Sequence, residues 1–178
     1  MQGLKPVLLA LLVLTTSAAF AQSFQQYIQA SSDDAEEKYD GSYVTTSSSD
    51  IELMYDTWND QQLQTVGLRF DNVTIPANSF ITNAYIQFTA DGSYSGNFSM
   101  TIWGEDVAIP STYSNTTSNI SSRVTTSAMV NWVTIPAWTD GAAGADQRTP
   151  DLSSIVTELI SSNGWQNGDP MSFIVIGT

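Results

Sequence analysis

Short runs in which apolar and polar residues alternate recur along this chain, and they restrict its fold more than any other feature. The alternation is clearest at residues 50–53, 66–70 and 84–89. A period of two places every second side chain on the same face of a strand, so these runs predict half-buried β-strands. Further candidate strands are residues 27–30, 42–45, 98–103, 129–133 and 171–176.

Turn-forming residues separate these candidate strands. The clearest are Asp40-Gly41, Pro76-Ala77-Asn78, Asp91-Gly92 and Asn167-Gly168. Glycine and asparagine tolerate the backbone conformations of tight turns, and proline fixes the first turn position. Short strands separated by turns are typical of sandwiches and jelly rolls. The sequence therefore predicts an all-β, jelly-roll-like β-sandwich.

In one segment the apolar residues recur every three to four positions instead of every two. Its apolar stripe consists of Leu152, Ile155, Val156, Leu159 and Ile160. Such spacing predicts a short amphipathic helix that caps one end or face of the sandwich. We expect Thr149 as its N-cap, Pro150 at its first position and Asp151 near the positive end of the helix dipole. Gly164 suits the left-handed position after the last turn.

The first 21 residues have the pattern of a signal peptide. Lys5 gives a basic start, residues 7–14 are apolar, and Ala19-Phe20-Ala21 places small residues where a signal peptidase reads them. We therefore expect a mature domain at residues 22–178 that is secreted or displayed at the cell surface. A retained membrane anchor is the alternative, but eight apolar residues are too few to span a bilayer, so no membrane insertion is expected after cleavage.

The composition limits both partners and chemistry. The chain has 18 acidic and 5 basic side chains, and removal of Lys5 with the signal peptide leaves 4 − 18 = −14. This charge repels nucleic acid and anionic lipid and attracts cations. Absence of cysteine rules out disulfides, and absence of histidine removes the commonest general base and every Ser-His-Asp arrangement. A non-catalytic, extracellular role is therefore favoured.

Four carboxylates occupy five positions near the start of the mature chain: Asp33, Asp34, Glu36 and Glu37. Oxygen-only ligands are those that Ca²⁺ prefers, so the sequence predicts a stabilising Ca²⁺ site here. The spacing is not that of an EF-hand loop, and a solvated acidic loop remains the alternative. Other carboxylates that the fold could bring to the ion are Asp50, Glu52, Asp91, Glu105 and Asp106.

Two tryptophans lie in loop-like, polar surroundings. Trp58 follows Tyr55 in the run 55–62, and Trp138 lies in the run 136–141. Exposed rings stack on the apolar faces of sugars while neighbouring polar groups bond the hydroxyls. Trp58, Trp138 and Tyr55 are therefore the predicted ligand-binding residues. Trp132 and Trp165 lie among apolar neighbours and are expected in the core.

A glycosidase would need two carboxylates facing each other across a cleft. Glu36-Glu37 and Glu105-Asp106 are adjacent in sequence, so on a strand their side chains point to opposite faces. The three arginines of the mature chain are expected to form structural ion pairs. They are Arg69, Arg123 and Arg148. No catalytic residue is predicted, and we expect the protein not to be an enzyme.

Part of this pattern resembles the DNRLRE-type modules. In them an "LRF" strand is followed by an "IP" turn and a strand of the form I-x-x-A-x-I-x-F, as at residues 66–70, 73–76 and 81–88 here. Residues 131–132, the predicted helix and the apolar run after Asn167-Gly168 are similar too. The resemblance covers most of the mature chain. It implies a β-sandwich of secreted or cell-surface bacterial proteins, commonly classed with carbohydrate-binding modules.

We therefore expect a non-catalytic, Ca²⁺-stabilised carbohydrate-binding module whose partner is a glycan. The alternatives are a structural or adhesive surface module with a protein partner, and a fragment of a polysaccharide-degrading enzyme. Modules of the resembled type continue after a strand such as residues 171–176 into one more strand. The domain is accordingly expected to lack its last strand and to leave an open sheet edge, where a protein partner could bind.

Overall fold

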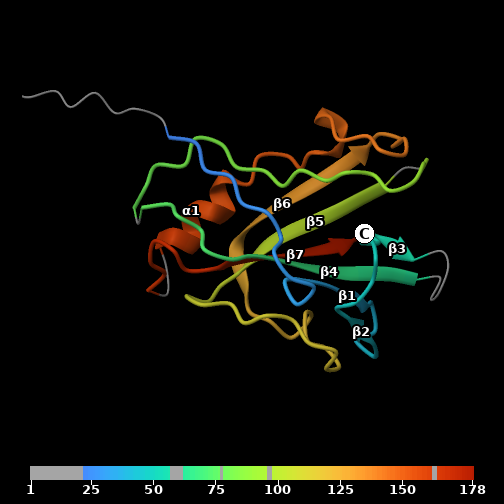
Figure 1. Cartoon of the computed structure of the whole chain (residues 1–178), viewed down its shortest axis with the longest axis horizontal. Coiled ribbons are helices and arrows are strands. Elements are labelled where there is room, and N and C mark those ends of the chain that lie inside the picture. Colours follow the sequence, from blue (N-terminus) through green and yellow to red (C-terminus); the bar gives the residue numbers. More distant parts are fainter. Residues whose placement is uncertain (1–21, 57–61, 77, 96–97, 162–163) are drawn as a thin grey trace, which may run out of the picture.

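The computed structural model describes residues 22–56, 62–76, 78–95, 98–161 and 164–178 (Figure 1). The predicted all-β class with one short helix is confirmed. The strands are β1 (Asp34–Lys38), β2 (Val44–Thr45), β3 (Tyr55–Asp56), β4 (Gln62–Phe70), β5 (Phe98–Glu105), β6 (Thr125–Ile135) and β7 (Met171–Gly177). The helical elements are the 3₁₀ turn η1 (Ala145–Gln147) and the helix α1 (Ser153–Ser161).

The strands form one antiparallel sheet in the order β2-β1-β4-β7-β5-β6, with β3 paired to the start of β4. Strand β7 lies inside this sheet and pairs with both neighbours, Val175 standing opposite Val66 of β4 and Ile102 of β5. The last strand of the chain is therefore not an edge strand. Within the described residues the edges are β2 and β6. That a further strand follows Thr178 stays a prediction.

Alternating residues of the central strands supply the inner face of the sheet and its main core. They are Val66 and Leu68 of β4, Met100 and Ile102 of β5, and Phe173 and Val175 of β7. Helix α1 packs on this face through its predicted apolar stripe, which is buried. Gly104 permits the close approach, because a Cβ there would lie 2.7 Å from Leu159 Cδ1. Full burial of each such side chain stabilises the folded state by roughly 1.5 to 3 kcal/mol.

The start of the helix differs from the prediction. It begins at Ser153, whose N–H donates to Asp151 Oδ1 at 2.9 Å, so Asp151 caps the helix. The Thr149 hydroxyl instead accepts the N–H of Ile86 at 3.0 Å, because residues 84–86 run alongside this segment. Gly164 has the expected positive φ of 78°. None of the helices in the described ranges has the length and apolar character needed to cross a bilayer.

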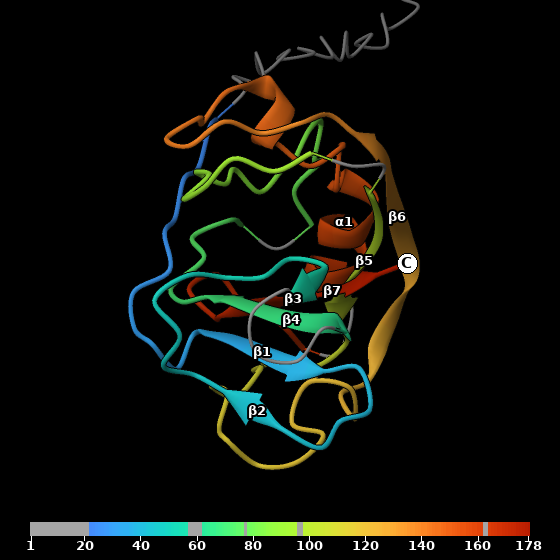
Figure 2. The ribbon, with the colours of Figure 1, turned by 90° about the vertical axis from the view of Figure 1, so that its right-hand side faces the viewer.

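The second layer consists of extended segments rather than a regular sheet. Residues 84–94 run antiparallel to residues 138–152, with isolated bridges at Gln87–Arg148 and Tyr94–Trp138. These segments, green and orange, lie side by side in both ribbon views (Figure 2). Residues 27–30 and 50–53, predicted as strands from their alternation, also lie outside the strands of the sheet. The molecule is thus sandwich-like, with one sheet and one irregular layer.

Residues 107–124 cover part of the outer face of the sheet. Tyr113 packs against Gly67, and its hydroxyl is 2.6 Å from Ser172 Oγ. The Arg123 guanidinium lies 4.1 Å from the centre of the Tyr113 ring and 2.7 Å from Glu105 Oε2. The expected structural ion pair of Arg123 is therefore confirmed.

Candidate functional site

The acidic segment that was predicted as a Ca²⁺ loop forms strand β1 and the residue before it. Alternation along the strand sends Asp34 and Glu36 to one face of the sheet and Glu37 to the other. Asp33, only 3 % exposed, pairs with Arg69, which confirms the expected ion pair of that arginine. Glu37 is fully buried and accepts the N–H of Ile120 at 2.6 Å.

These four carboxylates therefore do not converge on one point. Asp33 is held by a guanidinium and Glu37 by backbone N–H groups of the segment that covers the outer face. Among the residues that the structure describes, no three side chains of the metal-ligating types gather in one place. Ca²⁺ binding stays a prediction, and the geometry assembles no ligand set for it from the segment 33–37.

The three predicted ligand-binding aromatics have different positions. Trp58 lies in residues 57–61, outside the described ranges. Tyr55 is 44 % exposed on β3. Trp138 is half-buried in the second layer, where it packs against Phe88 and Trp132, and its Nε1–H donates to Asp146 O at 3.0 Å. Trp138 therefore packs at the edge of the core rather than standing free on the surface. The predicted core positions of Trp132 and Trp165 are confirmed.

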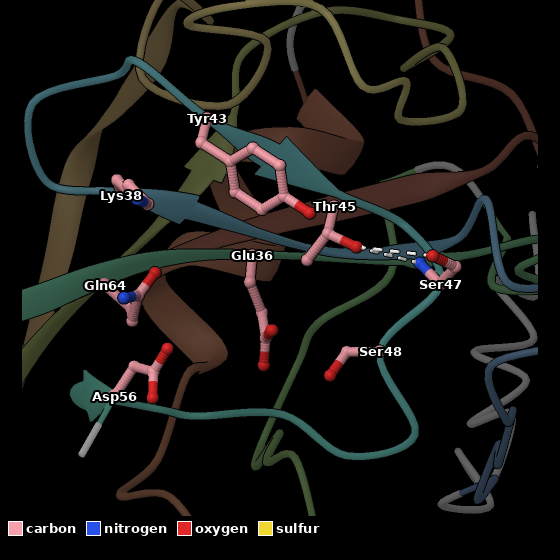
Figure 3. A pocket seen from close by; sticks show the side chains of 8 residues that line it. All are labelled: Glu36, Lys38, Tyr43, Thr45, Ser47, Ser48, Asp56 and Gln64. Atoms are coloured by element: carbon pink, nitrogen blue, oxygen red, sulfur yellow. Dashed lines mark hydrogen bonds between the residues drawn. The ribbon is translucent and has the colours of Figure 1, made fainter. Parts of the chain in front are cut away.

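A groove of about 330 Å³ lies over the end of the sheet at which β2, β1, β4 and β3 are adjacent (Figure 3). Its lining is polar apart from one aromatic ring. The lining residues are Glu36 and Lys38 of β1, Tyr43 and Thr45 at β2, Ser47 and Ser48 after it, Asp56 of β3 and Gln64 of β4.

The register of the strands explains why the groove lies here. Gln64 precedes Val66 by two positions, so it lies on the same inner face of β4 as the core residues. Lys38 stands opposite Gln64, and Glu36 stands opposite both Val66 and Thr45. The inner face of the sheet thus changes from apolar to polar along β4 and β1. The groove begins where the apolar core ends.

Three of the lining side chains are polar and almost inaccessible to solvent: Glu36 is 7 % exposed, Asp56 5 % and Gln64 4 %. Burial of a polar group is costly unless a hydrogen bond compensates it. Glu36 Oε1 accepts the N–H of Glu52 at 2.5 Å. Gln64 Nε2 reaches Gln62 O only at 3.5 Å, and no hydrogen bond from a described residue reaches Gln64 Oε1.

The Glu36 carboxyl is uncharged at neutral pH. Burial first, and then the hydrogen bond and negative charge of Glu52 and the charge of Asp50, raise the pKa of Glu36 from 4.5 to about 9. A protonated carboxyl can both donate and accept a hydrogen bond. Close to it, the Tyr43 side chain is 54 % exposed, with the Lys38 ammonium 5.4 Å from the centre of its ring.

The sequence interpretation named Glu36 for a different role and did not single out Tyr43, Thr45 or Gln64. One signal was present: the alternation of β4 extends back from Val66 to Gln64 and Gln62, which places polar residues on the core-facing side. It becomes informative only once the pairing with β1 is known, since that pairing adds Glu36 and Lys38 to the same surface.

The chain has no significant match among protein-family models, curated proteins or solved structures. The resemblance to DNRLRE-type modules therefore stays a prediction, and the candidate site has to be judged from its own geometry.

Proposed function

We propose that this protein is a non-catalytic carbohydrate-binding module that takes a saccharide into the groove between β2, β1, β4 and β3. One observation carries the proposal: three polar side chains that are more than nine-tenths buried line an open groove beside an exposed tyrosine ring. Sugars present an apolar ring face together with several hydroxyls. A site of this composition matches both features.

Each lining residue has a role in this assignment. The Tyr43 ring stacks on a sugar face, and the Lys38 ammonium beside it donates to a hydroxyl or ring oxygen. Gln64 Oε1 accepts from a hydroxyl, and the protonated Glu36 carboxyl can exchange a hydrogen bond with another. Hydroxyls of Thr45, Ser47 and Ser48 complete the wall (Figure 3).

The dimensions of the groove favour weak, reversible binding. A volume of about 330 Å³ is at the lower end of the range for small-ligand pockets. Sugar hydroxyls exchange bonds to water for bonds of similar worth to protein. Dissociation constants on the order of 10 μM to 1 mM are therefore expected.

Binding without catalysis is supported by the state of Glu36. An efficient general acid has a pKa close to the working pH, whereas the pKa of Glu36 is raised to about 9. Its Oε1 is also occupied by the N–H of Glu52. These features suit a fixed hydrogen-bonding group better than a group that cycles its proton. The predicted signal peptide supports a place for such a module outside the cell.

The test is affinity electrophoresis and calorimetry on a panel of soluble neutral polysaccharides with wild type and Tyr43→Ala. Loss of the stacking ring should weaken binding by about 1 to 3 kcal/mol, because it removes most of the apolar contact. Tyr39→Ala is the matched control: Tyr39 is 62 % exposed and does not line the groove. Absence of binding to every glycan, or equal losses in the two variants, would contradict the assignment.

A further inference from the structure

We propose that two copies of this protein associate through the free edge of β6, as a pair of antiparallel strands related by a two-fold axis at Asn131. This surface is remote from the groove, and its assignment does not rest on the proposed function. The sheet order puts β6 at the opposite edge from β2, and Figure 2 shows the two strands on different sides of the molecule.

The register of the sheet shows which backbone groups of β6 are free. The N–H of Thr178 donates to Ser99 O at 3.0 Å, so Ser99 and every second residue of β5 form their hydrogen bonds with β7. The residues between them therefore bond to β6, through Trp132 and Val130. It follows that the alternate residues of β6 direct their N–H and C=O groups toward an edge at which no strand of the described residues lies. They are Met129, Asn131 and Val133.

This free stretch of the edge has a defined length. At its start the Glu158 carboxylate accepts the N–H groups of Ser127 and Ala128, both at 2.7 Å, and covers the edge there. At its end the register shifts, and Thr134 has a positive φ of 56°, which marks a bulge. Bulges, charges, prolines and covering groups protect sheet edges from pairing with other strands. Residues 129–133 contain neither a charge nor a proline.

The side chains of residues 129–133 are complementary to a second copy of the same strand. Antiparallel pairing about Asn131 places Met129 of each copy opposite Val133 of the other. These apolar side chains are 53 % and 61 % exposed, so each pair removes from water a surface that the single copy leaves accessible. At the axis, Asn131 Oδ1 accepts the Thr101 hydroxyl at 3.0 Å, while Asn131 Nδ2 has no partner among the described residues. Each Asn131 amide can therefore donate to the other across the axis.

Charge is compatible with self-association here. The chain has a net charge of −13, so much of its surface repels another copy. The paired stretch is neutral, and Glu158 lies near Ser127, away from the axis. In the proposed pair the two Ser127 positions are about 27 Å apart, well beyond the roughly 8 Å over which charges interact in physiological salt. A two-fold pair also occupies both free edges and ends at two copies.

Sedimentation velocity of the wild type, from micromolar to millimolar concentration, measures the association. The paired stretch is short, so we expect the mass to rise to that of two copies only in the upper part of this range. Val133→Lys removes an apolar contact and puts a charge on the free edge, so it should leave the protein monomeric. Met129→Lys is a second variant with the same expectation, should the first not fold. Val124→Lys is the control: this valine is 64 % exposed, lies just before β6, and should still permit association.

A single cysteine tests the register, because the chain has none of its own. Asn131→Cys brings one thiol from each copy to the axis. The Cα atoms of a hydrogen-bonded antiparallel pair are about 5.5 Å apart, which is within the range of a disulfide. Mild oxidation should therefore form the covalent dimer roughly tenfold faster than in Val124→Cys, whose thiols meet only by collision.

Three results would overturn the proposal. The first is a wild type that stays monomeric at millimolar concentration. The second is association of Val133→Lys and Met129→Lys as strong as that of Val124→Lys, or growth beyond two copies, which indicates a head-to-tail contact. The third is disulfide formation in Asn131→Cys no faster than in Val124→Cys, which excludes the two-fold register.

Discussion

At the scale of single residues, the groove depends on which side chain stands at each position of the inner face of the sheet. Glu36 occupies the same face of the sheet as Val66, its partner across β1 and β4. A valine there would extend the core, whereas the carboxyl introduces a buried polar group that needs partners. Burial, and then its proximity to Glu52 and Asp50, raises the pKa of Glu36 to about 9. The contribution of Glu36 to stability therefore depends on pH.

Glu36→Gln should therefore flatten the dependence of stability on pH. The pKa of Glu36 is about 9 in the folded state against 4.5 for an ordinary glutamate, so the folded state binds more protons between these values. Stability from this group is complete below about pH 4.5 and is lost as the pH rises through 9. The wild type should lose up to about 1.4 kcal/mol per pH unit more than the variant in this window.

Urea denaturation at pH 5, 7 and 9 measures this difference. Asp40→Asn serves as the control and should keep the wild-type slope. Hydrogen bonds to Ser42 lower the pKa of Asp40, so this carboxyl stays ionised from pH 5 to pH 9 and does not titrate in the window. Parallel slopes for wild type and Glu36→Gln would show that Glu36 does not carry the proton.

At the scale of elements, the two faces of β4 pack against different parts of the protein, the main core on one side and residues 107–124 on the other. Its inner face carries Val66 and Leu68, while Gly67 on the outer face receives the ring of Tyr113. The absence of a side chain at Gly67 lets residues 107–124 lie close on the sheet. The Tyr113 hydroxyl is then placed 2.6 Å from Ser172 Oγ on β7.

Gly67→Ala is expected to destabilise the fold by about 1 to 3 kcal/mol, the usual cost of overpacking. The added Cβ would lie 2.4 Å from Tyr113 Cζ, and the buried ring has little room to move. Gly144→Ala is the matched control, because the nearest atom to its Cβ is Gln147 Oε1 at 3.6 Å. Denaturation midpoints that fall equally in the two variants would count against close packing at Gly67.

The strands and the helix could be predicted where the spacing of apolar residues is enough to identify them. Alternation located β4, further candidate runs fell within β5, β6 and β7, and the three-to-four spacing located α1. Residues 84–89 alternate equally well but have only single bridges and scattered hydrogen bonds to residues 138–152. The acidic run 33–37 was predicted as a Ca²⁺ site, with a solvated acidic loop as the alternative, because its carboxylates are clustered. Partners far away in the sequence, such as Arg69 and Ile120, make β1 possible.

The candidate site was less predictable, because it depends on the register in which β1 and β3 pair with β4. Glu36, Gln64 and Asp56 become neighbours only through the pairing of β1 and β3 with β4. Nothing local to Gln64 distinguishes it from Gln62, the other glutamine of the same strand. Trp138 was chosen for its polar surroundings, yet Phe88 and Trp132 lie against its ring once the second layer forms. Local composition predicts exposure, whereas the tertiary fold decides it.

At the scale of the whole molecule, a chain without cysteine has no disulfide to stabilise it, so packing and polar contacts carry more of its stability. Both faces of the sheet are covered, the inner face by α1 and the second layer and part of the outer face by residues 107–124. Glu37 anchors residues 120–121 of the outer cover to β1 by backbone hydrogen bonds, and Asp33 links the start of β1 to Arg69 of β4 by an ion pair.

Asp33→Asn should lower stability by about 1 to 3 kcal/mol, and by the same amount in EDTA and in millimolar Ca²⁺. Asp33 and Arg69 are both largely buried, with side chains 5 % and 12 % exposed, so loss of the charge leaves the guanidinium undercompensated. Asp71→Asn removes the other carboxylate partner of Arg69, which is 53 % exposed, and should cost less than about 1 kcal/mol. Thermal melts of wild type and both variants in the two buffers make the comparison. The contrary outcome is a wild-type melting midpoint that rises in Ca²⁺ and no longer rises after Asp33→Asn. It would place a Ca²⁺ ion at Asp33, and the protein contacts described above would then explain only part of the stability of this fold.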